Sequence, residues 1–147
     1  MRRYLLVLPL IIACARAETP SADSAAAAAS AGLTEADVAG TWTGTFTPEG
    51  DTARVPWTDV CGGGTCRLVA APAPNDTIVS TYTIQGDSVV GVSSAYADTS
   101  IVKGAMVVDH WVARPRAGQL TGSGRMVLAD RPDSVVLRYT FQGSRNP

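Results

Sequence analysis

Hydrophobic and polar residues alternate along residues 40–46. Trp42, Gly44 and Phe46 share one face of this stretch, and the threonines at 41, 43 and 45 share the other. Successive side chains of a β-strand point to opposite sides of the sheet, so a period of two is typical of a strand with one buried face. The stretch therefore predicts the first strand of a sheet.

Similar short segments follow, separated by turns rich in Gly, Pro, Asn and Asp. The further predicted strands cover residues 54–58, 67–71, 77–85, 88–96, 101–113, 119–129 and 134–142. Pro56 predicts that the first of these is an edge strand or contains a bulge, because proline cannot donate to the hydrogen-bond ladder. About eight strands predict an all-β fold, either a small antiparallel up-and-down β-barrel or a β-sandwich.

Aromatic residues on these strands are candidates for lining a ligand-binding interior. An eight-stranded barrel encloses just enough room for side chains or one small ligand. Glycines within the predicted strands permit the bends with which a barrel closes, and they leave space: Gly91, Gly104, Gly122 and Gly124. The candidate ligand-binding residues are Trp42, Phe46, Tyr82, Tyr96, Trp111 and Tyr139. The alternative is that the same rings fill the core.

The N-terminal residues have the pattern of an export signal. Arg2 and Arg3 precede an apolar run over residues 5–13. This run has about half of the roughly twenty residues that a membrane-spanning helix needs. The sequence therefore predicts export rather than a permanent transmembrane helix.

The end of the apolar run, Ile11-Ile12-Ala13-Cys14, resembles the lipobox of bacterial lipoproteins. The resemblance implies a signal peptide of residues 1–13, a lipid-modified Cys14 as the new N-terminus, and attachment to the membrane through that lipid. Alanine rather than aspartate follows the cysteine, which favours the outer membrane facing the periplasm. Cleavage after Ala17 is an alternative that would give a secreted protein, because residues 15–17 fit the small-x-small rule.

Residues 14–32 consist almost entirely of Ala, Ser, Thr, Pro and acidic residues. Such a composition cannot bury a core, so we expect a flexible tether. Residues 33–38 predict a single helical turn with Thr34 as its N-cap and acidic residues in the first turn. The predicted barrel domain covers residues 33–147, a length typical of one domain.

Removal of the signal peptide leaves a weakly acidic protein. Ten Lys and Arg remain against thirteen Asp and Glu, so the formal charge is 10 − 13 = −3. Binding to a phosphate backbone requires a basic face, and we therefore predict no nucleic-acid partner.

The cysteines that remain after Cys14 predict a disulfide rather than a cofactor site. Cys61 and Cys66 would pair in an oxidising compartment. Haem attachment needs Cys-x-x-Cys-His, and zinc would need further ligands that the lone His110 cannot supply. We predict no metal and no cofactor.

The sequence contains no recognisable catalytic set. Asp109 cannot orient the only histidine, His110, because neighbours in a strand point to opposite faces. Residues 91–95 lack the second glycine of a nucleophile elbow. We therefore predict no catalytic residue and a protein that is not an enzyme.

The run Gly40-Thr41-Trp42, which follows a helical turn and opens a meander of strands, resembles the calycins, a group that includes lipocalins and avidin-like barrels. The resemblance implies that Trp42 closes the narrow end of the barrel and that an arginine near the last strand stacks across it. Arg145 has the same parity as Tyr139 and Phe141, so it is the candidate partner of Trp42 in a cation–π contact.

Two functions follow as expectations. The first is an envelope-anchored lipoprotein with a lipocalin-like barrel that binds a small apolar or amphipathic ligand. The second is a structural or interaction lipoprotein with a filled barrel, which contacts another envelope protein through its loops or through an exposed edge at residues 54–58. As a whole, the chain also resembles small predicted lipoproteins of bacterial envelopes.

Overall fold

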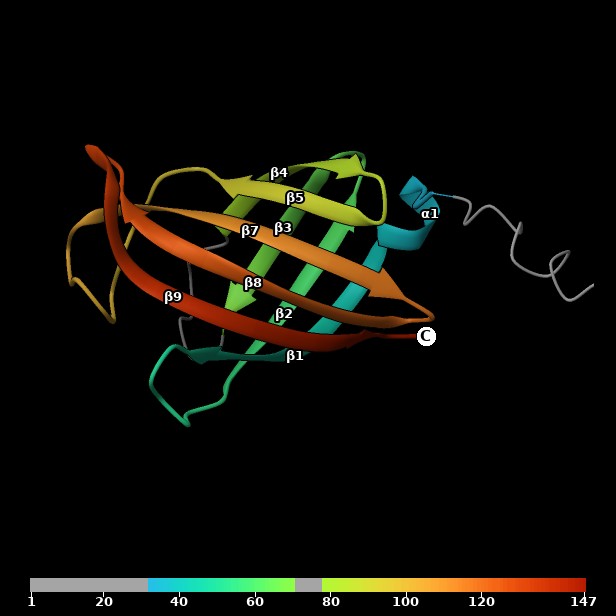
Figure 1. Cartoon of the computed structure of the whole chain (residues 1–147), viewed down its shortest axis with the longest axis horizontal. Helices are drawn as coiled ribbons and strands as arrows, with labels where there is room; N and C mark the ends of the chain where they lie inside the picture. Colours follow the sequence, from blue (N-terminus) through green and yellow to red (C-terminus); the bar gives the residue numbers. More distant parts are fainter. Residues whose placement is uncertain (1–31, 71–77) are drawn as a thin grey trace, which may run out of the picture. The chain divides into compact units, whose positions relative to one another are not determined.

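A computed structural model of the chain describes residues 32–70 and 78–147, which contain one short helix and nine strands (Figure 1). The elements are α1 (Glu35–Val38), β1 (Gly40–Pro48), β2 (Val55–Gly62), β3 (Thr65–Ala70), β4 (Ile78–Gln85), β5 (Ser88–Ser93), β6 (Tyr96–Ala97), β7 (Met106–Arg116), β8 (Gln119–Leu128) and β9 (Arg131–Arg145). The predicted signal peptide, Cys14 and all of the predicted tether except Gly32 lie outside the described residues. Within those residues, no helix has both the length and the apolar character needed to span a membrane.

Eight of the strands form a closed antiparallel barrel. The hydrogen-bonded order is β5-β4-β3-β2-β1-β9-β8-β7, and the pairing of β5 with β7 closes the ring. The short β6 pairs with β7 beside this closure. The prediction of an all-β antiparallel barrel is confirmed, and the β-sandwich alternative is wrong.

The strand register keeps the inward-facing residues of neighbouring strands side by side. Gly44 of β1 lies between Trp57 of β2 and Gly143 of β9. Gly91 of β5 likewise pairs with Tyr82 of β4 and with Trp111 of β7. The period-two alternation in the sequence therefore becomes one continuous inner surface of the barrel.

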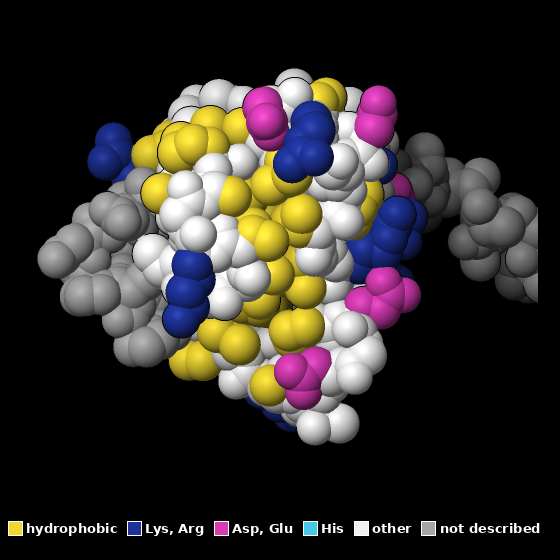
Figure 2. Space-filling view, turned by 90° about the vertical axis from the view of Figure 1, so that its left-hand side faces the viewer, with side chains coloured by type: hydrophobic (Ala, Val, Ile, Leu, Met, Phe, Trp, Pro, Cys, Tyr) yellow, Lys and Arg dark blue, Asp and Glu magenta, His cyan; other side chains and the backbone are white. Residues whose placement is uncertain are grey.

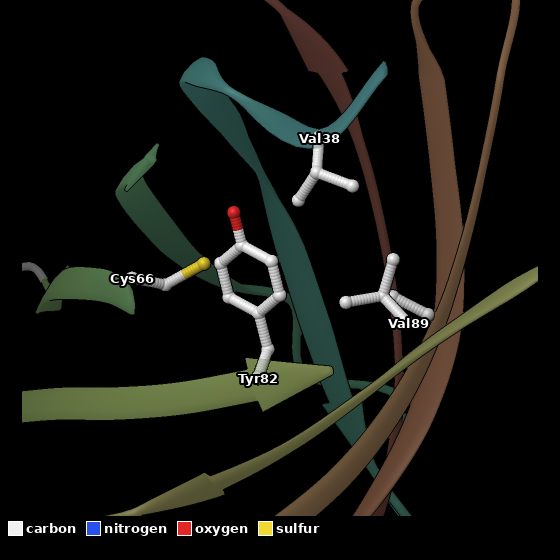
Figure 3. Close-up of a cluster of buried hydrophobic side chains, with 5 residues drawn as sticks. Val38, Cys66, Tyr82 and Val89 are labelled. Atoms are coloured by element: carbon white, nitrogen blue, oxygen red, sulfur yellow. The ribbon is translucent and has the colours of Figure 1, made fainter. Parts of the chain in front are cut away.

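One end of the barrel is closed by α1 and packed with hydrophobic side chains (Figure 3). The buried residues of this cluster are Val38, Cys66, Tyr82, Val89 and Ala113. Each residue comes from a different element: α1, β3, β4, β5 and β7. Strands β3 and β5 begin at this end of the barrel, and β4 and β7 finish there. The core therefore joins the helix to four neighbouring strands of the barrel, β3, β4, β5 and β7.

Several predicted strands have different bounds in the structure: those predicted over residues 54–58 and 134–142 are longer, and two others differ for the reasons that follow. The strand predicted over residues 101–113 begins at Met106, because the carboxylate of Asp98 accepts hydrogen bonds from the backbone N–H groups of Ser100, Ile101 and Val102. These bonds hold a loop where a strand was expected. The strand predicted over 88–96 is divided into β5 and β6.

The exposed edge expected at residues 54–58 is absent from the second half of that segment. Trp57 and Thr58 pair with β1 on one side and with β3 on the other. Val55 and Pro56 pair with β1, and the structure describes no strand partner on their other side within residues 32–70 and 78–147.

Candidate functional site: the barrel interior

The helix α1 is held against the barrel by Trp42 and Arg145. The Arg145 guanidinium carbon lies 4.9 Å from the centre of the Trp42 ring, so the structure brings this predicted pair together. Trp42 Nε1 donates to the carbonyl of Val38 over 2.8 Å, and Arg145 donates to the carbonyls of Ala36 and Asp37. The last carbonyls of a helix have no partners within it. Trp42 and Arg145 supply those partners, and the helix thereby closes this end of the barrel.

The side chain of Glu35 attaches the same helix to the barrel strands and to the turn after β2. Its Oε1 accepts hydrogen bonds from the Tyr82 hydroxyl over 2.6 Å and from the backbone N–H of Gly63 over 2.7 Å. Burial and this hydrogen bond to Glu35 raise the pKa of Tyr82 to about 12. Tyr82 is thus a neutral hydrogen-bond donor that belongs to the closure of the barrel.

In the middle of the barrel, aromatic rings lie against glycines of the neighbouring strands. A Cβ atom on Gly91 would lie 2.1 Å from Cζ2 of Trp111, and one on Gly124 would lie 2.4 Å from Cζ of Tyr139. The other such pairs are Phe141 on Gly122, and Trp57 on Gly44 and Gly143. Rings placed in this way cover the wall instead of projecting across the interior.

The expectation that the strand glycines leave empty space is therefore wrong. At Gly91, Gly122 and Gly124 the space beside the glycine is filled by a ring. Gly104 lies in the loop before β7, with a φ of 82°. Any free volume in the interior must lie inside the layer of rings.

Asp109 of β7 is a buried carboxylate with both oxygens satisfied. The hydroxyl of Tyr96 donates to Oδ2 over 2.5 Å, and the hydroxyl of Tyr139 donates to Oδ1 over 3.2 Å. Burial raises the pKa of Asp109, although these two hydrogen bonds act in the opposite direction. Two of the predicted ligand-binding residues, Tyr96 and Tyr139, are thus brought together by an acid that the sequence analysis did not single out.

Asp59 of β2 is a second inward carboxylate, and it is not satisfied in this way. Its Oδ1 is buried without a hydrogen-bond partner in residues 32–70 and 78–147. Burial raises the pKa of Asp59 to about 6, and a hydrogen bond from the backbone of Val60 offsets part of this effect. At neutral pH the group therefore carries a charge that the surrounding residues stabilise poorly.

The Cys61–Cys66 disulfide lies beside Asp59. The two residues pair directly across β2 and β3, and their sulfur atoms are 2.05 Å apart. Ligand atoms of Asp59, Cys61 and Cys66 all lie within 4.8 Å of one another, which is a spacing suited to a metal. However, the thiolate is the form of cysteine that binds metals, and both sulfurs are committed to the disulfide. Only Asp59 retains a ligand atom.

Trp57 adds an unsatisfied donor to the same face of β2. Its side chain is 7% exposed, and Nε1 has no hydrogen-bond partner in the described part of the chain. The ring packs edge-on against Phe141, with centroids 6.2 Å apart. We define the interior site by its inward residues on three strands: Trp57 and Asp59 of β2, Asp109 and Trp111 of β7, and Tyr139 and Phe141 of β9.

The aromatic rings in the middle of the barrel are partly accessible to solvent. Phe46, Trp111, Tyr139 and Phe141 are half-buried, whereas Trp42 at the closed end is only 2% exposed. Figure 2 views the end opposite α1 and shows hydrophobic side chains gathered across its centre, with charged side chains around them. The accessible part of the inner surface is therefore apolar and aromatic.

The six predicted ligand-binding residues divide between two regions. Trp42 and Tyr82 belong to the closed end, where they hold α1. Phe46, Tyr96, Trp111 and Tyr139 lie further along the interior, where Phe46 stacks on Tyr139 with centroids 5.6 Å apart. Asp59 and Asp109 are not among the predicted site residues, although their parity with Trp57 and Trp111 is a signal that they face inward.

The outer face carries the only histidine. His110 points away from the interior, and with Arg125 and Arg138 it lines a shallow groove of about 360 Å³ on the outside of β5, β7, β8 and β9. Val92 and Val112 border the same groove. Asp109 and His110 therefore act on opposite sides of the barrel wall and form no acid–base pair.

In comparisons with known proteins, no protein-family model, no curated protein and no solved structure matches the chain.

Proposed function

We propose that the barrel binds a small amphipathic molecule in its interior and that the protein is an envelope-anchored, calycin-like lipoprotein. The observation that carries the proposal is the interior site itself, a partly accessible aromatic surface beside buried polar atoms that lack partners. Small-molecule sites are mostly apolar and contain a few polar groups that fix the orientation of the ligand. The proposed role is binding rather than catalysis.

Titration of the purified domain with the fluorescent probe N-phenyl-1-naphthylamine tests this function. We expect saturable binding, because the rings of Phe46, Trp111 and Tyr139 offer an apolar surface that solvent reaches. Trp111→Ala should weaken binding about tenfold, since it removes one large side chain from the contact. Val112→Ala is the matched control, because Val112 is 41% exposed on the outer face of the same strand.

Two results would contradict the proposal. One is the absence of saturable probe binding by the wild-type domain. The other is equal weakening by Trp111→Ala and Val112→Ala, which would place the probe on the outside of the barrel.

The proposed anchor is tested separately from the interior. Cys14→Ser should abolish incorporation of labelled palmitate into the full-length chain expressed in a bacterial host, because the Cys14 sulfur is the atom that takes the diacylglycerol with its fatty acids. Cys61→Ser is the matched control and should retain the label. Label that persists in Cys14→Ser would refute lipidation at this residue and leave the alternative of cleavage after Ala17.

A further inference from the structure

The two acids of the interior differ in what a ligand could offer them. Both oxygens of Asp109 already accept hydrogen bonds from tyrosine hydroxyls. In contrast, Asp59 keeps a buried oxygen without a donor among the described residues. A buried charged group without a partner is costly, so a donor from a ligand gains more at Asp59 than at Asp109.

Asp59 forms no ion pair within residues 32–70 and 78–147. The two ion pairs within the described ranges, Arg114–Asp87 and Arg131–Asp130, both involve exposed side chains. The guanidinium of Arg145 stacks on Trp42 and donates to carbonyls of α1, and its buried Nε has no acceptor among the described residues. Arg145 and Asp59 both pair with Trp42, from β9 and β2, but Asp59 Oδ1 has no donor within hydrogen-bond distance in the described residues. A cationic group of a bound molecule would supply one.

Trp57 provides an independent indication of a ligand. It precedes Asp59 by two positions on the same face of β2, so the two Cα atoms are about 6.6 Å apart. Its indole Nε1 is buried and lacks an acceptor within residues 32–70 and 78–147. Two neighbouring inward positions of β2 thus carry an unused donor and an unused carboxylate oxygen among the described residues.

We propose that the interior site binds an organic ammonium ion with a hydroxyl group two carbons from its nitrogen, that is, an amino alcohol with an apolar tail. The ammonium group donates to Asp59 Oδ1, the oxygen accepts from Trp57 Nε1, and the tail lies against the aromatic rings. Aromatic faces also attract cations, which adds to the preference for a positive charge. This inference rests on the proposed function, because it names the ligand class of the same site.

A matched series of eight-carbon ligands tests the proposal by isothermal titration calorimetry. The four ligands are N-octylethanolamine, octylamine, 1-octanol and octanoate, which share the tail and differ at the polar end. We expect affinity to fall in that order, with octylamine about tenfold tighter than 1-octanol, as for one charge-assisted hydrogen bond. Asp59→Asn should remove most of this difference, whereas Asp133→Asn, which removes an exposed acid, should leave it unchanged.

The outcomes separate the ligand class from the function. Binding of 1-octanol or octanoate as tightly as octylamine would overturn the ammonium preference while leaving the interior site as a general apolar site. An amine preference that persists in Asp59→Asn would overturn the role of Asp59. Absence of binding by all four ligands would contradict the proposed function itself.

The role of Trp57 as the donor to the ligand oxygen is tested with Trp57→Phe. This substitution should reduce the affinity for N-octylethanolamine to that for octylamine. An unchanged ratio of the two affinities would refute the hydrogen bond from Trp57 to the ligand oxygen.

Discussion

Gly44→Ala is expected to lower the free energy of unfolding by about 3 kcal/mol or more, because it forces a side chain between two paired strands. A Cβ atom at Gly44 would lie 2.0 Å from the carbonyl oxygen of Gln142 and 2.6 Å from the Cα of Gly143. Both are backbone atoms of β9, so no side-chain rotation can relieve the contact. The pairing of β1 with β9 joins the first and last strands of the barrel, and the substitution would separate them.

Gly62→Ala is the matched control for this substitution. Gly62 also lies in a strand, yet a Cβ atom there would meet nothing within 4 Å. We expect its unfolding free energy to stay within about 0.5 kcal/mol of the wild type. Urea unfolding followed by circular dichroism measures both variants. Equal stability of Gly44→Ala and Gly62→Ala would show that β1 and β9 are not in such close contact.

Trp42→Ala should destabilise the domain by about 3–5 kcal/mol, the usual range for removing a large buried aromatic side chain. The Trp42 side chain is 2% exposed and contacts α1 through its hydrogen bond to Val38. Its loss also removes the ring on which the Arg145 guanidinium stacks. The helix would therefore lose two of its attachments, and hydrogen exchange at its amides should become faster.

Val60→Ala is the control for Trp42→Ala. Val60 is apolar but 50% exposed on the outer face, so its truncation should change stability by less than about 0.5 kcal/mol. Similar losses for the two variants would show that Trp42 does not anchor the closed end. Unchanged hydrogen exchange in α1 would contradict its role as the partner of the helix carbonyls.

Much of the fold was predictable because the alternation in β1 and β9 is regular. The parity of Tyr139 and Phe141, continued through Gly143, correctly placed Arg145 on the inner face beside Trp42. The alternation failed where local bonds or irregular pairing intervene. Val135 has the same parity as Tyr139 and Phe141, yet it is 37% exposed, and a register shift between β8 and β9 occurs where it pairs with Val127. Hydrogen bonds from the backbone N–H groups of residues 100–102 to the Asp98 carboxylate likewise hold a loop where hydrophobicity alone predicts the start of a strand.

The candidate site was only partly predictable. Aromatic residues on the inward parity were found because their positions follow from the period of two. Asp59 and Asp109 share that parity, but acids in β proteins usually lie in turns, and hydrophobic patterning gives no reason to place a carboxylate inside. Whether each oxygen has a donor depends on residues far away in sequence, such as Tyr139 for Asp109. That information exists only in the folded chain.

The adjacency of β1 and β9 also determines how the domain can be attached to anything else. Trp42 pairs with Arg145, and the backbone N–H of Asn146 donates to the carbonyl of Thr41, so the chain enters and leaves the barrel at the end closed by α1. Among the described residues, the opposite end carries connections between strands (Figure 1). A fusion partner, an affinity tag or a surface linkage joined directly to residue 32 or to residue 147 would therefore leave that opposite end unobstructed, and a circular permutant of residues 32–147 would need only a short linker between these two ends.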